Sequence, residues 1–172
     1  FPCVLSVVTK WIENPREDLP NDVMNWQQIK EVAQHELVEI GSHTDNLHRG
    51  VIYNPYGNDA AAAFSRIFYE KEKRYESELE FQNRIYLDKK ESKKILENKT
   101  GQKIRCLIWP YGAYNCCGLE QTKQAGYKLM FTLDVGWATP DDLDSIPRGL
   151  IYNNPKIEDF ITGELKLPIE ER

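Results

Sequence analysis

The sequence predicts an α/β fold with parallel strands. Short apolar runs alternate with segments of helical periodicity along most of the chain. Glycine, proline or asparagine stands where many of these runs end. A length of 172 residues is enough for one domain with a hydrophobic core. No repeat or domain boundary is visible, so we expect one unit over residues 1–161 and a polar tail or linker over 162–172.

The first third of the chain predicts two strands that flank one helix. Residues 1–8 form an apolar run that is expected to be a buried strand, and a polar loop follows it. Asn25 is a predicted N-cap for a helix over 26–35, because Gln28 stands at the capping-box position. Residues 37–40 are the next expected strand, and Gly41 follows it.

The middle of the chain is rich in charge. Residues 53–58 read Tyr-Asn-Pro-Tyr-Gly-Asn, a composition typical of turns. Residues 60–99 carry sparse apolar positions among many charges, which predicts helices with one buried face and a solvated charged face. The pair Thr100-Gly101 is expected to end this helical segment.

Two strands and a short helix are expected in the last third, followed by another strand. Residues 104–109 form an apolar run that stops at Pro110. A helix is predicted over 119–125, and strands are predicted over 127–133 and 146–151.

Composition excludes some classes of function. The net charge of -5 disfavours a nucleic-acid surface, which is usually basic. No apolar run approaches the ~18 residues of a membrane span. The four cysteines contain no CxxC pair, so a thiolate zinc site is not expected. We expect Cys3 and Cys106 to be buried thiols, and Cys116 and Cys117 to open a helix, although a reactive or disulfide-linked pair is the alternative.

His43 and His48 are the strongest functional candidates. They follow a predicted strand, and strand ends are where α/β folds place their chemistry. Imidazole is the commonest ligand for zinc and related metals. A catalytic zinc usually has three protein ligands, so two imidazoles leave the site incomplete. The alternative interpretation is two unrelated loop histidines that form local hydrogen bonds.

A second candidate segment is the run Trp-Pro-Tyr-Gly-Ala-Tyr-Asn at 109–115. Aromatic, proline and glycine residues at a strand end can shape a pocket, and exposed backbone N–H groups can stabilise an oxyanion. The alternative is a tight turn with aromatic packing. Asp134 also lies at a predicted strand end. It is either a metal ligand, a residue that orients one, or a turn aspartate, and the last is favoured.

Together these segments resemble the polysaccharide deacetylases of carbohydrate esterase family 4, the NodB homology family. The sequences VEIGSHT, NPYGN, WPYGAYN and IPRGLI resemble most closely the branch that acts on poly-β-1,6-N-acetyl-D-glucosamine. The resemblance covers residues 1–161. It implies a (β/α) barrel-like fold and metal-dependent de-N-acetylation that releases acetate.

The chain departs from the family pattern in three ways. The Thr-Phe-Asp-Asp-Gly motif, which supplies an aspartate ligand and the general base, is absent, and so is the histidine expected as general acid. The arginine often found before the Pro-Tyr motif is unmatched, since Ile108 and Trp109 stand there, and Arg105 lies too early. The resemblance therefore implies the C-terminal part of a deacetylase domain. An N-terminal segment with the Asp-Asp motif is the expected partner, and the chain is expected to be inactive alone.

The resemblance assigns roles to particular residues. His43 and His48 would hold a divalent metal, with zinc favoured over nickel, cobalt or iron. The backbone of Tyr111 would donate to the oxyanion. The substrate pocket would comprise Trp109, Pro110, Tyr111 and Tyr114.

The polymer class implies a cell-envelope location, periplasmic or associated with the outer membrane, and contact with a polysaccharide-export system. The competing hypotheses are a glycan-binding relative without activity and a structural α/β interaction domain.

Overall fold

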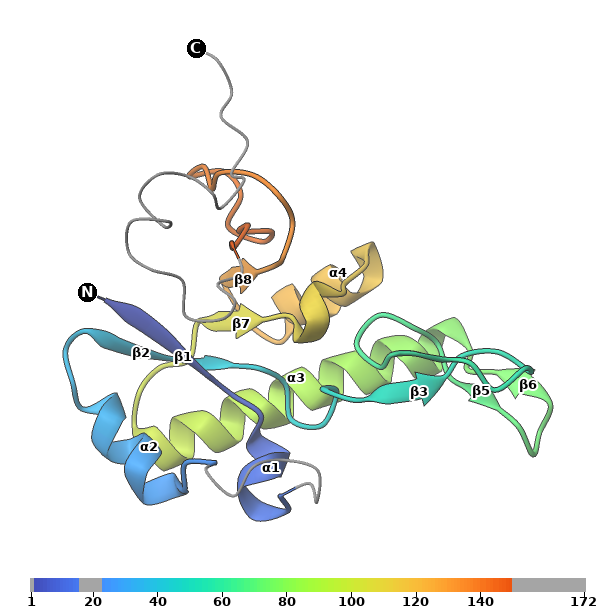
Figure 1. Cartoon of the computed structure of the whole chain (residues 1–172), viewed down its shortest axis with the longest axis horizontal. Coiled ribbons are helices and arrows are strands. Elements are labelled where there is room, and N and C mark those ends of the chain that lie inside the picture. The colour runs from blue at the N-terminus through green and yellow to red at the C-terminus, as the bar shows by residue number, and fades with distance from the viewer. Residues whose placement is uncertain (1, 16–22, 150–172) are drawn as a thin grey trace, which may run out of the picture.

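A parallel sheet is the centre of the chain in this computed structural model, which describes residues 2–15 and 23–149. Within these residues the sheet has four strands in the order β1-β2-β7-β8 (Figure 1). They are β1 (Cys3–Val7), β2 (Val38–Ser42), β7 (Cys106–Ile108) and β8 (Leu129–Phe131). Each pairs in parallel with its neighbour, so the predicted α/β fold with parallel strands is confirmed.

The long helix α3 runs beneath this sheet, beside α2, and α4 packs along it (Figure 1). The helical elements are α1 (Thr9–Glu13), α2 (Trp26–Ala33), α3 (Glu78–Thr100), the 3-10 turn η1 (Pro110–Gly112) and α4 (Cys116–Gln124). Of these, α1 was not expected, because its short sequence was assigned to a polar loop. None of the described helices is long and apolar enough to cross a membrane.

Local capping explains the start of α2 and both ends of α3. Asn25 accepts from the backbone N–H of Gln28, whose side chain accepts in return, so the predicted capping box is confirmed. Ser77 and Glu80 form the same motif at the start of α3. Gly101 ends α3 with a φ of 76°, a conformation that glycine adopts at little cost.

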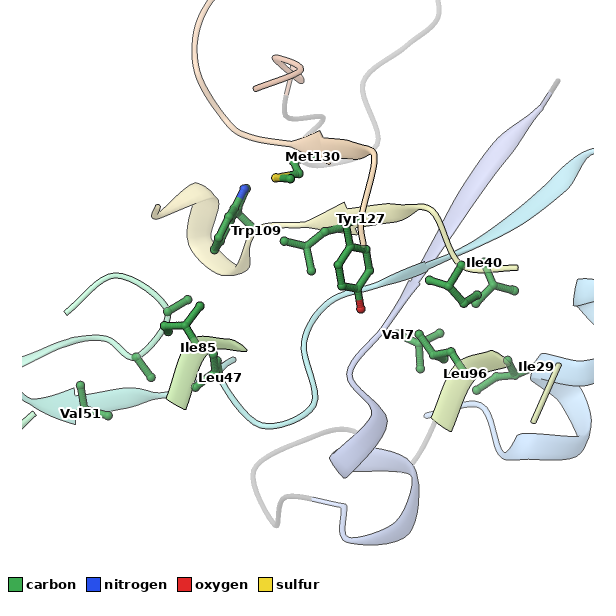
Figure 2. Packing of buried hydrophobic residues seen from close by; sticks show 14 of the residues in the cluster. Val7, Ile29, Ile40, Leu47, Val51, Ile85, Leu96, Trp109, Tyr127 and Met130 are labelled. Atoms are coloured by element: carbon green, nitrogen blue, oxygen red, sulfur yellow. The ribbon is translucent and has the colours of Figure 1, made fainter. Parts of the chain in front are cut away.

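One face of the sheet packs against the helices. In a parallel register Leu5 lies beside Ile40, and Leu107 lies beside both Ser42 and Met130. Side chains alternate along a strand, so these residues share one face. The apolar residues among them join a buried cluster with residues of α2 and α3, which Figure 2 shows around Ile29, Ile85, Leu96, Trp109 and Tyr127. This burial is the main stabilising contribution to the fold.

Residues 60–76 are not helical, contrary to the prediction. Two antiparallel hairpins occupy the region, β3 (Gly50–Ile52) with β4 (Asp59–Ala61) and β5 (Phe68–Tyr69) with β6 (Arg74–Tyr75). The physical reason is tertiary: pairing with β3 overrides the helical preference of the alanine run.

A buried ion pair ties these hairpins to α3. Glu76 is 1% exposed and its Oε1 lies 2.7 Å from Nε of Arg84. Arg84 also donates to the carbonyls of Ala62 and Ser65, at 2.8 and 2.9 Å. The second carboxylate oxygen of Glu76 accepts from the N–H of Ile67 at 3.0 Å. One carboxylate and one guanidinium therefore satisfy several otherwise unpaired backbone groups.

The charged face of α3 is only partly solvated, which corrects a second expectation. Lys89 is fully buried, with its Nζ 4.6 Å from the centre of the Trp109 ring. Among the described residues its ammonium has no hydrogen-bond partner. Burial lowers the pKa of Lys89 from 10.5 to about 8, although the nearby Asp88 carboxylate opposes the shift. A cation in this position costs free energy at neutral pH.

Two smaller expectations about the first strand also need correction. β1 is an edge strand of the described sheet, and its Cys3 and Val4 are exposed rather than buried. Cys106 is buried as predicted. All four cysteines are free thiols, and Cys116 and Cys117 open α4 as expected.

The expected strand at 146–151 is seen only in part. Ile146 bridges Phe131 in parallel, and residues 150–172 lie outside the described residues, as does the predicted tail at 162–172.

The substitution Lys89→Met tests the buried ammonium. The unfolded state binds more protons than the folded state between pH 8 and 10.5, so wild-type stability should rise across this range, by on the order of 3 kcal/mol. Lys89→Met should lack this rise. Urea unfolding at several pH values measures it, with Lys90→Met as the exposed control. Parallel pH profiles for wild type and Lys89→Met would contradict the assignment.

The substitution Glu76→Gln tests the ion pair that holds the hairpins. It leaves a largely buried guanidinium without its counter-charge, so we expect a loss of about 3 kcal/mol in the free energy of unfolding. Glu91→Gln breaks an exposed pair with Lys94 and should cost less than about 0.5 kcal/mol. Chemical denaturation of both variants checks this. Equal losses in the free energy of unfolding would show that the buried pair contributes no more to stability than the exposed pair.

Candidate active site

The ends of neighbouring strands bring two of the sequence candidates together. His43 directly follows β2, and its backbone N–H donates to the carbonyl of Val7 at 2.8 Å. The segment from Trp109 follows β7, the strand that pairs with β2. Because parallel strands end at the same edge of a sheet, the histidine loop and the 109–115 segment meet there.

The ring of His43 is oriented by one backbone group. Its Nδ1 lies 2.7 Å from the carbonyl oxygen of Ile108. A carbonyl can only accept, so Nδ1 carries the proton and Nε2 carries the lone pair. Burial lowers the pKa of His43 to about 4; the bond to Ile108 opposes the shift and the charge of His48 adds to it. The imidazole is therefore neutral at neutral pH.

His48 lies beside His43 in a stack of rings. The two imidazole centroids are 4.8 Å apart. The ring of His48 stacks on Tyr111 at 4.5 Å with an interplanar angle of 12°, and Trp11 meets its edge at 4.7 Å. Both histidines are partly buried. The loop therefore curls back on itself and brings the two histidines, five positions apart in sequence, close together.

The histidine loop is held by groups from two helices. Asp88 of α3 accepts from the backbone N–H groups of Asp45 and Asn46, at 3.1 and 2.8 Å. Thr9 of α1 donates its hydroxyl to Asp45 at 2.5 Å. Thr44 has a φ of 79°, an uncommon conformation for a β-branched residue. These contacts hold the loop in a conformation that the local sequence would not favour by itself.

The turn after β7 has an uncommon backbone conformation. Tyr111 has a φ of 57° and Gly112 a φ of 66°. A β-carbon on Gly112 would lie 2.6 Å from the β-carbon of Leu133, so only glycine fits. The turn is closed by the N–H of Gly112, which donates to the carbonyl of Trp109. The N–H of Tyr111 stands one position earlier, where a 3-10 turn offers no acceptor.

Trp109 and Pro110, two residues of the expected substrate pocket, lie beneath the surface of the turn. Trp109 has no exposed surface and Pro110 is also buried. The Trp109 ring lies between Lys89 and Tyr114, with the Tyr114 ring centroid 5.8 Å away. Its position beneath the turn makes it a support for the residues above. The exposed ring in this segment is that of Tyr111.

Tyr114 and Asp134 form a pair of their own. The Tyr114 hydroxyl donates to Asp134 at 2.5 Å, and this bond raises the pKa of Tyr114 to about 12. Asp134 does not join the histidines: within residues 2–15 and 23–149 no group of three His, Cys, Asp or Glu side chains could hold a metal ion. Asp134 is thus an orienting partner of Tyr114 in this structure.

The two imidazoles fit part of a metal site. His43 is neutral, its lone pair is on Nε2, and its other ring nitrogen is bonded to a carbonyl, as is usual for metal-ligating histidines. His48 adds a second imidazole at short range. These two residues could hold a divalent ion together with a further ligand.

Sequence reasoning missed the residues that hold this site together. Thr9, Trp11 and Asp88 all contact the histidine loop or its rings. Asp88 was assigned to a solvated helix face because it lies in a run of charge. No local signal distinguishes it from the other charged residues of α3, since its role depends on a loop more than 40 positions away.

The family and its solved members agree with this architecture. A family model described as polysaccharide deacetylase matches residues 2–130. A de-N-acetylase from Aggregatibacter actinomycetemcomitans has 32% identity and a TM-score of 0.81, covering 94% of this chain and 64% of that chain. A deacetylase domain from Bordetella bronchiseptica has 38% identity and a TM-score of 0.81, with 88% and 61% covered.

Curated relatives are similar over nearly all of the chain. The poly-β-1,6-N-acetyl-D-glucosamine N-deacetylase of Escherichia coli O157:H7 is 36% identical, and that of strain K12 is 35% identical. Each match covers 98% of this chain but 27% of the relative, so the chain spans about a quarter of their length. The family model covers most of the sequence and the fold is shared with solved members. The chain belongs to the polysaccharide deacetylase family.

Proposed function

We propose that this chain takes part in the metal-dependent removal of N-acetyl groups from a poly-β-1,6-N-acetyl-D-glucosamine-like biofilm polymer, with release of acetate. The curated relatives carry that substrate in their names. The observation that carries the proposal is the neutral His43, oriented by Ile108 and 4.8 Å from His48. Tyr111, whose ring stacks on His48, would add a backbone donor to the same site.

In this proposal His43 and His48 hold a divalent metal, with zinc favoured and nickel, cobalt or iron as alternatives. The metal would supply Lewis acidity and lower the pKa of a bound water toward about 7. Burial keeps His43 neutral and so available as a ligand. The stack with Tyr111 and Trp11 holds His48 in place.

The 110–114 segment would contact the acetamide group. The N–H of Tyr111 would stabilise the oxyanion of the tetrahedral intermediate; one such donor is typically worth roughly 10²–10³ in rate. The exposed ring of Tyr111 and the oriented hydroxyl of Tyr114 would border the sugar. Trp109 would act from below by supporting Tyr114.

The third ligand and the general base are proposed to come from paired aspartates outside these residues. Two facts support this: the described residues offer two histidines without a third ligand, and the curated relatives are much longer. On this view the chain alone is inactive. A segment carrying the Asp-Asp motif would complete the site, and its carboxylate would take the proton from the attacking water.

The substrate class leads to a proposed location in the cell envelope, in the periplasm or at the outer membrane, with access to a polysaccharide-export system. Cell fractionation with an antibody to this chain would test the location.

Replacing either candidate ligand tests the mechanism. In the longest natural polypeptide that contains this chain, we expect His43→Ala and His48→Ala to lower metal affinity by more than about 100-fold, because even outer contacts to a ligand are worth 10–100-fold. Acetate release should fall with it. The matched control is His35→Ala, since His35 is exposed beyond α2. Acetate release that survives His43→Ala would contradict the metal mechanism, and polymer binding without acetate release in the wild type would indicate a glycan-binding relative.

The pKa of His43 gives a pH prediction for the metal-free protein. The folded-state pKa of about 4 lies below the ordinary value of 6.5, so the unfolded state binds more protons between these values. Stability should therefore fall as the pH drops from 6.5 to 4, by up to about 3 kcal/mol. His43→Ala should lose less over this range. Urea unfolding at each pH, with EDTA present, measures the difference, and identical slopes would show that His43 titrates normally.

A further inference from the structure

A groove lined by aromatic residues lies between the hairpins and the first turns of α3 and α4. Its volume is about 460 Å³. Three of its lining rings are substantially exposed: Tyr53 at 40%, Phe64 at 47% and Tyr75 at 48%. Polar groups of Ser65, Arg66 and Glu78 share the lining. None of these residues belongs to the candidate active site.

The groove is preformed by hydrogen bonds to its backbone. Arg84, paired with Glu76, donates to the carbonyls of Ala62 and Ser65 and so holds the segment that carries Phe64. On the other side, the amide of Asn115 donates to the carbonyl of Phe64 at 2.7 Å. These bonds fasten the wall of the groove to both helices. A site that needs no ordering on binding retains more of its interaction free energy.

Two segments of the candidate active site lead directly into the groove along the sequence. Tyr53 stands five residues after His48, at the end of β3, and Asn115 stands directly after Tyr114. Asn115 lies four positions after Tyr111, a span of at most roughly 14 Å. Two segments that form the site therefore continue into the walls of the groove.

From this geometry we propose that the groove binds N-acetylglucosamine units of the same polymer, a few residues away from the unit that reacts. This inference rests on the proposed function. Pyranose rings present apolar C–H faces and hydroxyl edges, and flat aromatic rings beside hydroxyl, guanidinium and carboxylate groups match both. Arg66 and Glu78 have opposite charge, which suits an uncharged ligand. The groove would bind a long chain more tightly than a short one.

The test measures how affinity depends on the length of β-1,6-linked N-acetylglucosamine oligomers. Calorimetric titration uses the longest natural polypeptide that contains this chain, with EDTA present, and mass spectrometry of the recovered oligomers checks that acetyl groups remain. For the wild type we expect affinity to rise with length. In Tyr53→Leu and Tyr75→Leu, which keep apolar volume but remove the flat ring, affinity for long oligomers should fall roughly five- to tenfold.

Tyr56→Ala is the matched control, because Tyr56 is 89% exposed in the turn between β3 and β4 and does not line the groove. Affinity that is unchanged in both leucine variants would overturn the proposal. So would sedimentation in which the wild type forms a dimer and both leucine variants remain monomeric, because a second copy of the chain would then cover the groove. Length-dependent binding that the variants abolish, in a wild type that releases no acetate with metal, would support the groove and refute the proposed reaction.

Discussion

The hydrogen bond from Nδ1 of His43 to the carbonyl of Ile108 links the two halves of the candidate site. It joins the loop after β2 to the strand that leads into the Tyr111 turn. It exists because β2 and β7 are parallel neighbours whose carboxyl ends meet at one edge. The bond determines which nitrogen of His43 carries the proton, and burial keeps that ring neutral. The chemistry proposed for the histidine pair depends on this contact.

Helix α3 supports the site from below at a cost in stability. Its Asp88 holds the histidine loop, its Lys89 lies under Trp109, and its Arg84 anchors the hairpins. Polar groups buried in this way are expensive unless they are paired. The Asp88 carboxylate accepts two backbone hydrogen bonds and Arg84 pairs with Glu76. The Lys89 ammonium, in contrast, has no hydrogen-bond partner among the described residues and lies beside the Trp109 ring. Burying these groups of α3 lowers the stability of the fold, but it holds the histidine loop and the hairpins, which are distant in sequence, in fixed positions.

The hairpin region gives a physical reason to consider more than one sugar unit. The pair of Glu76 and Arg84 holds the segment that carries Phe64, and the rings of Phe64 and Tyr75 are exposed beside it. The same region begins where the histidine loop ends. A polymer that lies across both would use chain segments that are already adjacent.

Local sequence determined several features of this protein. Apolar runs separated by turn residues were sufficient to predict parallel strands, and the Asn25 capping box was predicted residue by residue. The two histidines were selected as functional candidates from their place after a predicted strand. The motifs around them were sufficient to recognise the family. Each of these signals spans only a few residues, so it can be read without knowing the contacts.

Tertiary structure alone decided the rest. Residues 60–75 form hairpin strands and turns in place of the first part of the predicted helical segment, because pairing with β3 and the buried Arg84 outweigh local propensity. Trp109 proved to be buried, because the hydrophobic core extends to the turn that follows Trp109. Asp88 proved to hold the histidine loop, although its sequence context is that of a solvated helix face. In each case the deciding partner lies far away in sequence, and only the folded chain brings it within hydrogen-bonding or packing distance.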